Sequence, residues 1–287
     1  MSREIRPHVV RDREALRDAV RGLRASGRRV GLVPTMGALH AGHRALMAEA
    51  RDAGEAVVVS IFVNPAQFDA ADDLAAYPRT FEADLAACAE EGVDVVFAPP
   101  PDAVYRGGHE TWVEVGGVSA DLEGAYRPGH FRGVATVVLK LLNMAAADRA
   151  YFGRKDFQQL KLIERLVADL DVPVEIVPVE TVREADGLAL SSRNVRLDSD
   201  ARRRALSLSR VLNEARGTLL DGEADIAAVE AGMLAGLRDA GAAADYAVVR
   251  DADTLTPLDR PAPRMVALVA ATVGGVRLID NVSVERA

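Results

Sequence analysis

The sequence predicts an α/β protein in which a Rossmann-like, doubly wound parallel sheet is followed by a smaller α+β domain. Up to about residue 180, short continuous apolar runs alternate with segments of helical periodicity, which is typical of a parallel sheet covered on both faces. After about Glu184, two helical segments precede strand-like runs, the last two joined by Gly274-Gly275, a two-residue hairpin signal. We therefore predict domains at residues 1–183 and 184–287.

The individual elements follow from these patterns in chain order. In the first domain, apolar runs predict strands at 30–33, 57–63, 93–98, 150–152 and 174–179, and helical spacing predicts helices at 12–26, 42–53, 79–91, 132–146 and 156–170. In the second, we expect helices at 199–217 and 224–240 and strands at 244–250, 265–272 and 276–284. Ligands of doubly wound sheets bind beyond the carboxyl ends of the strands, so the functional residues are expected in the loops that follow them.

Composition narrows the protein class. The chain has 287 residues, 49% of them hydrophobic, which is enough for a substantial core. Its 35 basic and 43 acidic residues give a net charge of −8, which argues against a general nucleic-acid surface. We expect no membrane partner, because no apolar run approaches the roughly 20 residues of a membrane span, and the polar N-terminus lacks the apolar core of a secretory signal. The single cysteine, Cys88, fits a reducing cytoplasm and is expected to be a buried structural thiol.

The segment from Val33 to His43 connects the first predicted strand to its helix. Gly37 and Gly42 would let the backbone approach a ligand closely, and a helix N-terminus offers unpaired N–H groups to anionic oxygens. His40 and His43, three residues apart, fall on one side of the turn. The pattern predicts a phosphate cradle with two imidazoles, although a glycine turn with two surface histidines would look the same. A metal site would need a third ligand, which no cysteine or HExxH pattern supplies.

The chain contains neither GxGxxG after the first strand nor a P-loop, so a nucleotide must be held differently. The sequence His40-Ala41-Gly42-His43 resembles the HxGH signature of the nucleotidyltransferase superfamily. In that superfamily, the histidines contact the triphosphate and stabilise charge while the α-phosphate is attacked.

Two further segments follow the second predicted strand. The run SIFVNPAQF at residues 60–68 ends with the amides Asn64 and Gln67, which are also plausible turn residues because Asn-Pro favours turns. A polar loop with YPRT at residues 77–80 then leads to Asp84, and its simplest interpretation is a solvent-facing loop with a helix cap.

Two more segments lie near the predicted domain boundary. In YFGRKDFQQL at 151–160, Lys155 would neutralise phosphate charge, Asp156 would cap the helix, and Gln159 projects from its first turn. In the loop at 185–194, Ser191, Ser192 and Arg193 suit phosphate oxygens, although Ser-Ser-Arg is also common in loops without such a role.

Taken in this order, the segments resemble the pantoate–β-alanine ligase family from about Arg29 to Asn281. The resemblance implies ATP-dependent condensation of (R)-pantoate with β-alanine to pantothenate, AMP and pyrophosphate through a pantoyl adenylate. It implies ATP as a substrate, Mg²⁺ as a cofactor and a homodimer. Two other interpretations stay open: a nucleotidylyltransferase that keeps the nucleotide on its product, and a nucleotide sensor without turnover.

The resemblance also implies residue roles. His40 and His43 would bind and polarise ATP, with His43 as proton donor, and Lys155 would contact the phosphates. Gln67 and Gln159 would hold pantoate, Asn64 would line its site, and Asp84 would bind Mg²⁺. The implied ATP site consists of Met36, Gly37, Ala38, Leu39, His40, Ala41, Gly42, His43, Gly153, Arg154, Lys155, Asp156, Val182, Leu190, Ser191, Ser192 and Arg193. Arg154 replaces a common glutamate and Leu190 a common methionine, so backbone contacts are expected there.

The remaining signals are interpreted as structural. His130 would cap or pack, with a direct catalytic role as the alternative, whereas His8 and His109 are expected at the surface. Trp112 and Val113 are expected in a strand. The segment 68–79 and the second domain are candidate covers that would shield a reactive adenylate from water.

Overall fold

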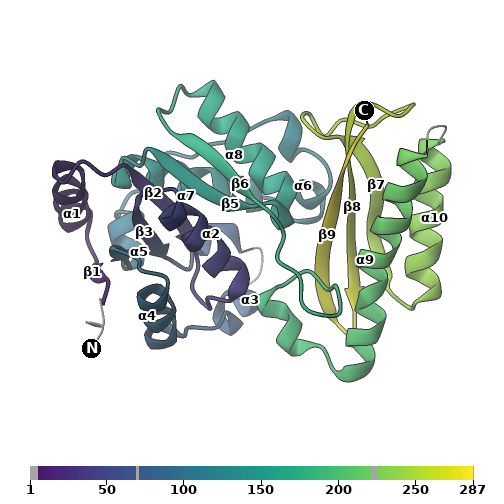
Figure 1. Ribbon diagram of the computed structural model, residues 1–287, viewed down its shortest axis with the longest axis horizontal. Helices are drawn as coiled ribbons and strands as arrows, with labels where there is room; N and C mark the ends of the chain where they lie inside the picture. Colours follow the sequence, from purple (N-terminus) through teal and green to yellow (C-terminus); the bar gives the residue numbers. More distant parts are fainter. Residues whose placement is uncertain (1–5, 69–70, 222–224, 287) are drawn as a thin grey trace. The chain divides into compact units, whose positions relative to one another are not determined.

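The computed structural model describes residues 6–68, 71–221 and 225–286. The chain forms two compact units (Figure 1). The first comprises Met1–Arg154 and Leu162–Glu180, and the second comprises Lys155–Lys161 and Thr181–Ala287. Residues 155–161 therefore group with the later part of the chain, which no signal in the sequence indicated.

The first unit contains a six-stranded, entirely parallel sheet with strand order β1-β4-β3-β2-β5-β6. The strands are β1 (His8–Val10), β2 (Val30–Thr35), β3 (Ala56–Ile61), β4 (Val95–Phe97), β5 (Arg149–Gly153) and β6 (Glu175–Val179). From β2, the chain adds β3 and β4 on one side and β5 and β6 on the other. This reversal places the switch point between β2 and β5 and confirms the predicted doubly wound fold.

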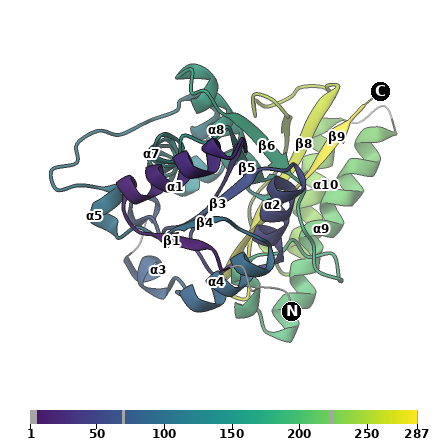
Figure 2. The same cartoon turned by 60° about the vertical axis from the view of Figure 1, so that its left-hand side comes forward.

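Helices cover the sheet on both faces. On one face, α2 (Ala41–Asp52) and α4 (Phe81–Glu90) contribute Met47 and Cys88 to an apolar cluster that includes Val57 and Val59 of β3. The intervening Val58 points to the opposite face, because side chains alternate along a strand, and it is buried there too. Figure 2 shows α1 (Arg13–Ala25) and α7 (His130–Ala145) side by side, away from α2 and α4. The remaining helices of this part of the chain are α3 (Ala71–Ala76), α5 (Pro101–Val104), α6 (Glu123–Tyr126) and α8 (Phe157–Asp169).

Most predicted elements are present with ends shifted by one or two residues, and three differences stand out. The three-residue edge strand β1 was not predicted, and the strand expected at 93–98 is confined to Val95–Phe97. The expectation of a strand at Trp112 and Val113 was wrong: neither residue has strand structure, and Trp112 is 43% exposed beneath the guanidinium of Arg132.

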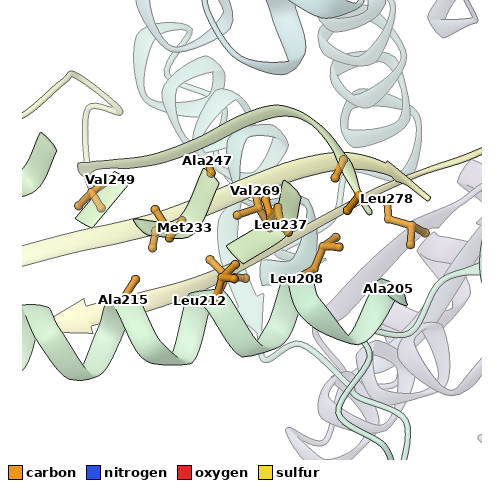
Figure 3. Close-up of a cluster of buried hydrophobic side chains, with 14 of the residues drawn as sticks. Ala205, Leu208, Leu212, Ala215, Met233, Leu237, Ala247, Val249, Val269 and Leu278 are labelled. Atoms are coloured by element: carbon orange, nitrogen blue, oxygen red, sulfur yellow. The ribbon is translucent and has the colours of Figure 1, made fainter. Parts of the chain in front are cut away.

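The second unit is a three-stranded antiparallel sheet with order β7-β8-β9 and two long helices. Its elements are α9 (Ser199–Leu220), α10 (Ile226–Asp239), β7 (Ala243–Asp251), β8 (Arg264–Val273) and β9 (Val276–Glu285). Gly274 and Gly275 have φ of +57° and +76°, and they join Val273 to its partner Val276 as the hairpin signal predicted. Both helices pack on the sheet through apolar side chains, including Leu208, Leu212, Met233, Leu237 and Val269 (Figure 3).

The expectation that Cys88 is buried is confirmed. Cys88 is fully buried in α4, and this burial, followed by the charge of Asp84, raises the pKa of its thiol to about 12. No helix in the described ranges combines the length and the apolar character that crossing a bilayer requires.

Candidate active site

The turn between β2 and α2 lies at the switch point of the sheet. Gly37 and Ala38 both have positive φ, +83° and +51°, so the chain bends sharply where β2 ends. The buried Thr35 fixes this end: its hydroxyl donates to the Ser60 carbonyl of β3 at 2.7 Å and accepts the N–H of Gly37 at 3.2 Å. The cradle predicted from the sequence is therefore a defined turn tied to the neighbouring strand.

Asp84 holds the other side of this turn from the first helical turn of α4. Its carboxylate is 2% exposed and accepts the backbone N–H groups of Ala38 at 3.1 Å and Leu39 at 2.8 Å. The hydroxyl of Thr80 donates to the same carboxylate at 3.2 Å. Both carboxylate oxygens of Asp84 therefore accept hydrogen bonds from this part of the chain. Asp84 is thus the residue that shapes the turn.

The hydrogen bonds of Asp84 are also relevant to Mg²⁺ binding, because the resemblance implies that Asp84 is a Mg²⁺ ligand. Protein Mg²⁺ sites generally use one or two carboxylates with waters and substrate phosphates. Both oxygens of Asp84 already accept hydrogen bonds, and within residues 6–68, 71–221 and 225–286 no three His, Cys, Asp or Glu side chains form a group that could hold a metal ion. The described residues therefore offer no magnesium cage made by the protein alone, and a site that Asp84 shares with substrate phosphates stays a prediction.

His40 and His43 cap the N-terminus of α2 reciprocally. His40 is the N-cap and its Nδ1 accepts the N–H of Gly42 at 3.1 Å, while Nδ1 of His43 accepts the N–H of His40 at 3.3 Å. The ring centroids are 4.1 Å apart and both side chains are half-buried. An Nδ1 that accepts a hydrogen bond carries no proton, so each neutral ring has its proton on Nε2. Each imidazole is therefore set as an Nε2–H donor at a helix N-terminus.

The amides that follow β3 are connected to this turn. Asn64 is 1% exposed and caps the short 3₁₀ helix Pro65–Gln67 by accepting the N–H of Ala66 at 3.3 Å. Its Nδ2 donates to Oε1 of Gln67 at 3.0 Å, and Nε2 of Gln67 donates to Sδ of Met36 at 3.1 Å. The structure therefore brings Met36, Asn64 and Gln67 together, and the turn role of Asn64 is combined with a contact to Gln67.

Helix α7 supports these amides from its first turns. Nδ1 of His130 lies 2.8 Å from the Gln67 carbonyl, and the carbonyl of Gly133 accepts Nδ2 of Asn64 at 3.1 Å. A Cβ at Gly133 would lie 2.2 Å from the Ala66 carbonyl oxygen, so α7 fits against residues 65–67 only with glycine there. His130 is buried and packs, as expected, whereas His109 is half-buried between Tyr105 and Trp112.

The other predicted site residues lie along the chain on either side of residues 154 and 155, where the first unit gives way to the second. In the first unit, Gly153 ends β5, and Arg154 pairs with Glu180 at 2.9 Å. In the second, Nζ of Lys155 is 3.7 Å from Asp156, and the Lys155 carbonyl accepts Nδ2 of Asn281 at 2.9 Å. Gln159 follows in α8.

The 181–194 segment of the second unit is held by buried and half-buried polar contacts. The N–H of Leu190 donates to the Val182 carbonyl at 2.9 Å. The hydroxyl of Ser191 accepts the N–H of Arg193 at 3.2 Å and so caps the 3₁₀ helix that begins at Ser192. Glu184 accepts from Asn194 and from Arg202, both at 2.6 Å. The hydrogen bond from Arg202 is the main reason that the pKa of Glu184 is lowered.

Sequence reasoning missed several residues that support the site. Gly133 and Tyr105 have no motif that marks them, and Thr35 lies within the segment from Val33 to His43 but was given no role there. Their contacts join segments 69, 41 and 25 residues apart. His40 as a helix cap was also missed, because Ser, Thr, Asp and Asn are the usual residues at that position.

Comparisons with known proteins agree over almost the whole chain. A family model described as pantoate–β-alanine ligase matches residues 8–283. The chain is 52% identical over 278 residues to a pantothenate synthetase of Cereibacter sphaeroides, covering 97% of the chain and 100% of the relative. A pantothenate synthetase of Paracoccus denitrificans is 52% identical over 279 residues, covering 96% of the chain and 98% of the relative.

Two solved structures are also similar. The pantothenate synthetase of Thermus thermophilus superposes with a TM-score of 0.90 at 44% identity, covering 96% of this chain and 98% of that one. A pantoate–β-alanine ligase of Francisella tularensis, complexed with β-γ ATP and β-alanine, gives a TM-score of 0.78 at 33% identity, covering 96% and 97%.

Proposed function

The chain belongs to the pantoate–β-alanine ligase family, and we propose that it forms pantothenate in two steps through a bound pantoyl adenylate. The overall reaction is the ATP-dependent ligation of pantoate to β-alanine. In the first step, a pantoate carboxylate oxygen bonds to the α-phosphorus of ATP and pyrophosphate leaves. In the second, the β-alanine amine bonds to the activated carbonyl carbon, the bond to AMP breaks and the amine gives up a proton.

The reciprocal cap of His40 and His43 is the observation that carries the first step. Both rings are set as Nε2–H donors at the N-terminus of a 12-residue helix that follows the strand at the switch point. Phosphoryl transfer depends chiefly on alignment and on neutralising charge at the non-bridging oxygens. We assign both histidines to those oxygens, with His43 as proton donor and Lys155 as a point charge on the phosphates.

The rest of the ATP site is proposed from the family resemblance together with the local geometry. Backbone groups at Met36–His43 would face the nucleotide, because the turn there is fixed by Asp84 and by Thr35. The further proposed positions are Gly153, Arg154, Asp156, Val182, Leu190, Ser191, Ser192 and Arg193. The hydrogen bonds around Glu184 and Asn194 support an ordered loop at the last four of these.

For pantoate, we propose Gln67 and Gln159 as the amides that hold its hydroxyl and carboxyl oxygens, with Asn64 at the side of Gln67. Gln67 supports this assignment because its Nε2 donates to Sδ of Met36, a weak acceptor, at 3.1 Å. A carboxylate or hydroxyl oxygen would be a stronger acceptor for the same N–H groups.

The finer biological setting is also proposed. Mg²⁺ would arrive with the triphosphate of ATP, since the described residues offer no cage of their own. A homodimer is proposed from the resemblance alone, and a cytoplasmic location from the family's biosynthetic reaction and the single buried Cys88. The boundary at 183/184, and the covering roles of residues 184–287 and 68–79, remain proposals. Residues 69 and 70, which belong to the segment 68–79, lie outside the residues that the structure describes.

ATP–pyrophosphate exchange tests the proposed route. Exchange that requires pantoate but not β-alanine is expected, because the adenylate forms before the amine reacts. AMP should then appear with pantothenate when β-alanine is added. A nucleotidylyltransferase would retain the nucleotide on its product, and a sensor would bind ATP without exchange. Absence of both exchange and AMP formation would contradict the ligase mechanism.

A further inference from the structure

The side chain of Gln67 ends a hydrogen-bonded chain that begins at Tyr105, a residue after α5 that no motif marks. We propose that Tyr105 is a positioning residue for pantoate: its hydroxyl fixes Asn64, and Asn64 turns Gln67 so that the Gln67 amide presents N–H donors to the substrate. The inference rests on the proposed function, because it concerns the pantoate end of that site.

The orientation of the Asn64 amide follows from two backbone groups whose roles are fixed. The N–H of Ala66 can only donate, and it lies 3.3 Å from Oδ1. The carbonyl of Gly133 can only accept, and it lies 3.1 Å from Nδ2. The hydroxyl of Tyr105 adds a second donor to Oδ1 at 2.9 Å. Oδ1 therefore accepts two hydrogen bonds, and one proton of Nδ2 is left for Gln67.

The orientation of Gln67 follows in turn. Nδ2 of Asn64 donates to it at 3.0 Å, so the facing atom must be the acceptor Oε1. This leaves Nε2 at the other end of the amide, 3.1 Å from Sδ of Met36, which is a weak acceptor. Gln67 is half-buried, whereas Asn64 is 1% exposed with all four of its hydrogen-bonding positions used inside the protein. Asn64 thus acts on pantoate through Gln67 rather than by touching it.

The position of Tyr105 itself is well fixed. Its ring meets the ring of His109 edge-on, with centroids 5.0 Å apart, and the ammonium of Lys140 lies 5.5 Å from the ring centroid. Trp112 packs on the same side chain at 6.1 Å. Burial raises the pKa of Tyr105 to about 12, so the hydroxyl keeps the proton that it donates to Asn64. In this proposal, the aromatic rings of His109 and Trp112 hold the ring of Tyr105 in place, a role that the sequence did not predict.

Without the Tyr105 hydroxyl, Oδ1 of Asn64 keeps only the longer bond from Ala66. The Ala66 N–H and the Gly133 carbonyl still set which end of the Asn64 amide faces which way, but the amide is held less tightly in place. The Gln67 side chain that accepts its hydrogen bond is then positioned less precisely, and so is the Nε2 that it offers to the substrate. The change should therefore appear in the affinity for pantoate rather than in the chemistry on ATP.

The experiment compares Tyr105→Phe with the wild-type protein (the unchanged chain) in pantoate-dependent ATP–pyrophosphate exchange. Loss of one hydrogen bond predicts a KM for pantoate raised about fivefold. The KM for ATP and kcat should stay within about twofold. Tyr151→Phe is the matched control, because it also removes a buried tyrosine hydroxyl, one that donates to Glu55 at 2.8 Å. That variant is expected to lose stability while keeping its KM for pantoate.

A double-mutant cycle separates positioning from a general structural effect. In a Gln67→Ala background, Tyr105→Phe should no longer change the KM for pantoate, and the same is expected in Asn64→Ala if the first background is too weak to measure. An unchanged fivefold effect in these backgrounds, or an equal rise in the KM for ATP, would overturn the inference. So would an unaltered KM in Tyr105→Phe.

The two proposals can fail separately. If the unchanged chain shows no exchange, titration calorimetry with pantoate alone makes the same comparison of Tyr105→Phe and Tyr151→Phe. If Tyr105→Phe then binds pantoate more weakly than the wild-type protein does, the positioning role is supported although the ligase mechanism fails. A chain that neither exchanges nor binds pantoate would overturn both.

Discussion

Oδ2 of Asp84 lies close against Gly37, since a Cβ at that glycine would be 2.9 Å from it. The turn after β2 therefore depends on a pair: a glycine that leaves room and a carboxylate that fills it and binds the next two backbone N–H groups. A side chain at Gly37 would crowd the carboxylate, and loss of the carboxylate would remove the acceptor of the Ala38 and Leu39 N–H groups.

Asp84→Asn is expected to destabilise the fold by about 1–3 kcal/mol, because an amide nitrogen would face a backbone N–H that now has an acceptor. The loss should be present in urea unfolding with a chelator and without ATP. Asp52→Asn, which changes a 71% exposed carboxylate, is the control and should have little effect. A variant of normal stability without ATP, whose defect is relieved by added Mg²⁺, would instead identify Asp84 as a metal ligand.

The two functions of His40 can be separated by substitution. His40→Asn keeps a good N-cap for α2 but removes the imidazole, so we expect near-normal stability with most exchange activity lost. His40→Ala should lose the same activity and also about 1 kcal/mol of stability. The exposed His8→Ala is the control for removal of a histidine. Normal exchange in His40→Asn would show that its role is confined to the cap.

His43→Ala should remain folded and lose most pantoate-dependent exchange, since removal of one donor to a developing phosphate charge commonly costs about 10²–10³ in kcat. The KM for pantoate should change less than kcat. Circular dichroism establishes the fold, and exchange kinetics give the rate. Normal turnover in the variant would contradict its proposed role as proton donor.

Acid should weaken the 181–194 segment through Glu184. Its pKa is lowered in the folded state, chiefly by the hydrogen bond from Arg202, so this contribution is fully present above the ordinary value of 4.5 and is lost as the pH falls through the lower folded pKa. Glu184→Gln should therefore show a flatter dependence of unfolding free energy on pH from about 6 to about 3. Glu214→Gln, at an exposed helix pair, is the control. Parallel pH curves for Glu184→Gln and the unchanged chain would rule this coupling out.

Cys88 should resist thiol reagents in the folded protein. Burial raises its pKa to about 12, so the thiolate needed for reaction is scarce near neutral pH and the sulfur is also out of reach. Labelling with an uncharged maleimide is expected to be slow in buffer and to follow unfolding in urea. Rapid labelling at a rate independent of urea would contradict this burial.

The sequence predicted what depends on local pattern. Continuous apolar runs and helical spacing identified most of the strands and helices, and Gly274-Gly275 identified the hairpin, because each of these signals lies within the element it specifies. β1 was missed because three residues carry no periodicity and its pairing with β4 joins His8 to Val95. Trp112 was misplaced because an aromatic residue favours strands, yet its ring packs under Arg132 and beside Tyr105 instead.

For the candidate site, too, the sequence predicted the local features but not the contacts between distant segments. The motifs identified the loops that follow β2 and β3, together with the histidines and amides in them. They did not show that Asp84 binds the backbone at Ala38 and Leu39, or that Tyr105 reaches Asn64, because such contacts are set by the packing of distant segments. A resemblance gives a residue a role, whereas the folded chain shows which atoms are already used.

The grouping of Lys155–Lys161 with the second unit has a consequence for genetic dissection of the protein. A gene fragment that begins at codon 184 would encode the three-stranded sheet without these residues. Asn281 would lose the Lys155 carbonyl as an acceptor, and Asp253 would lose its ion pair with Lys161. The second unit is therefore not a module that recombination can transfer by a single crossover, and a transplanted version would need the 155–161 segment supplied as well.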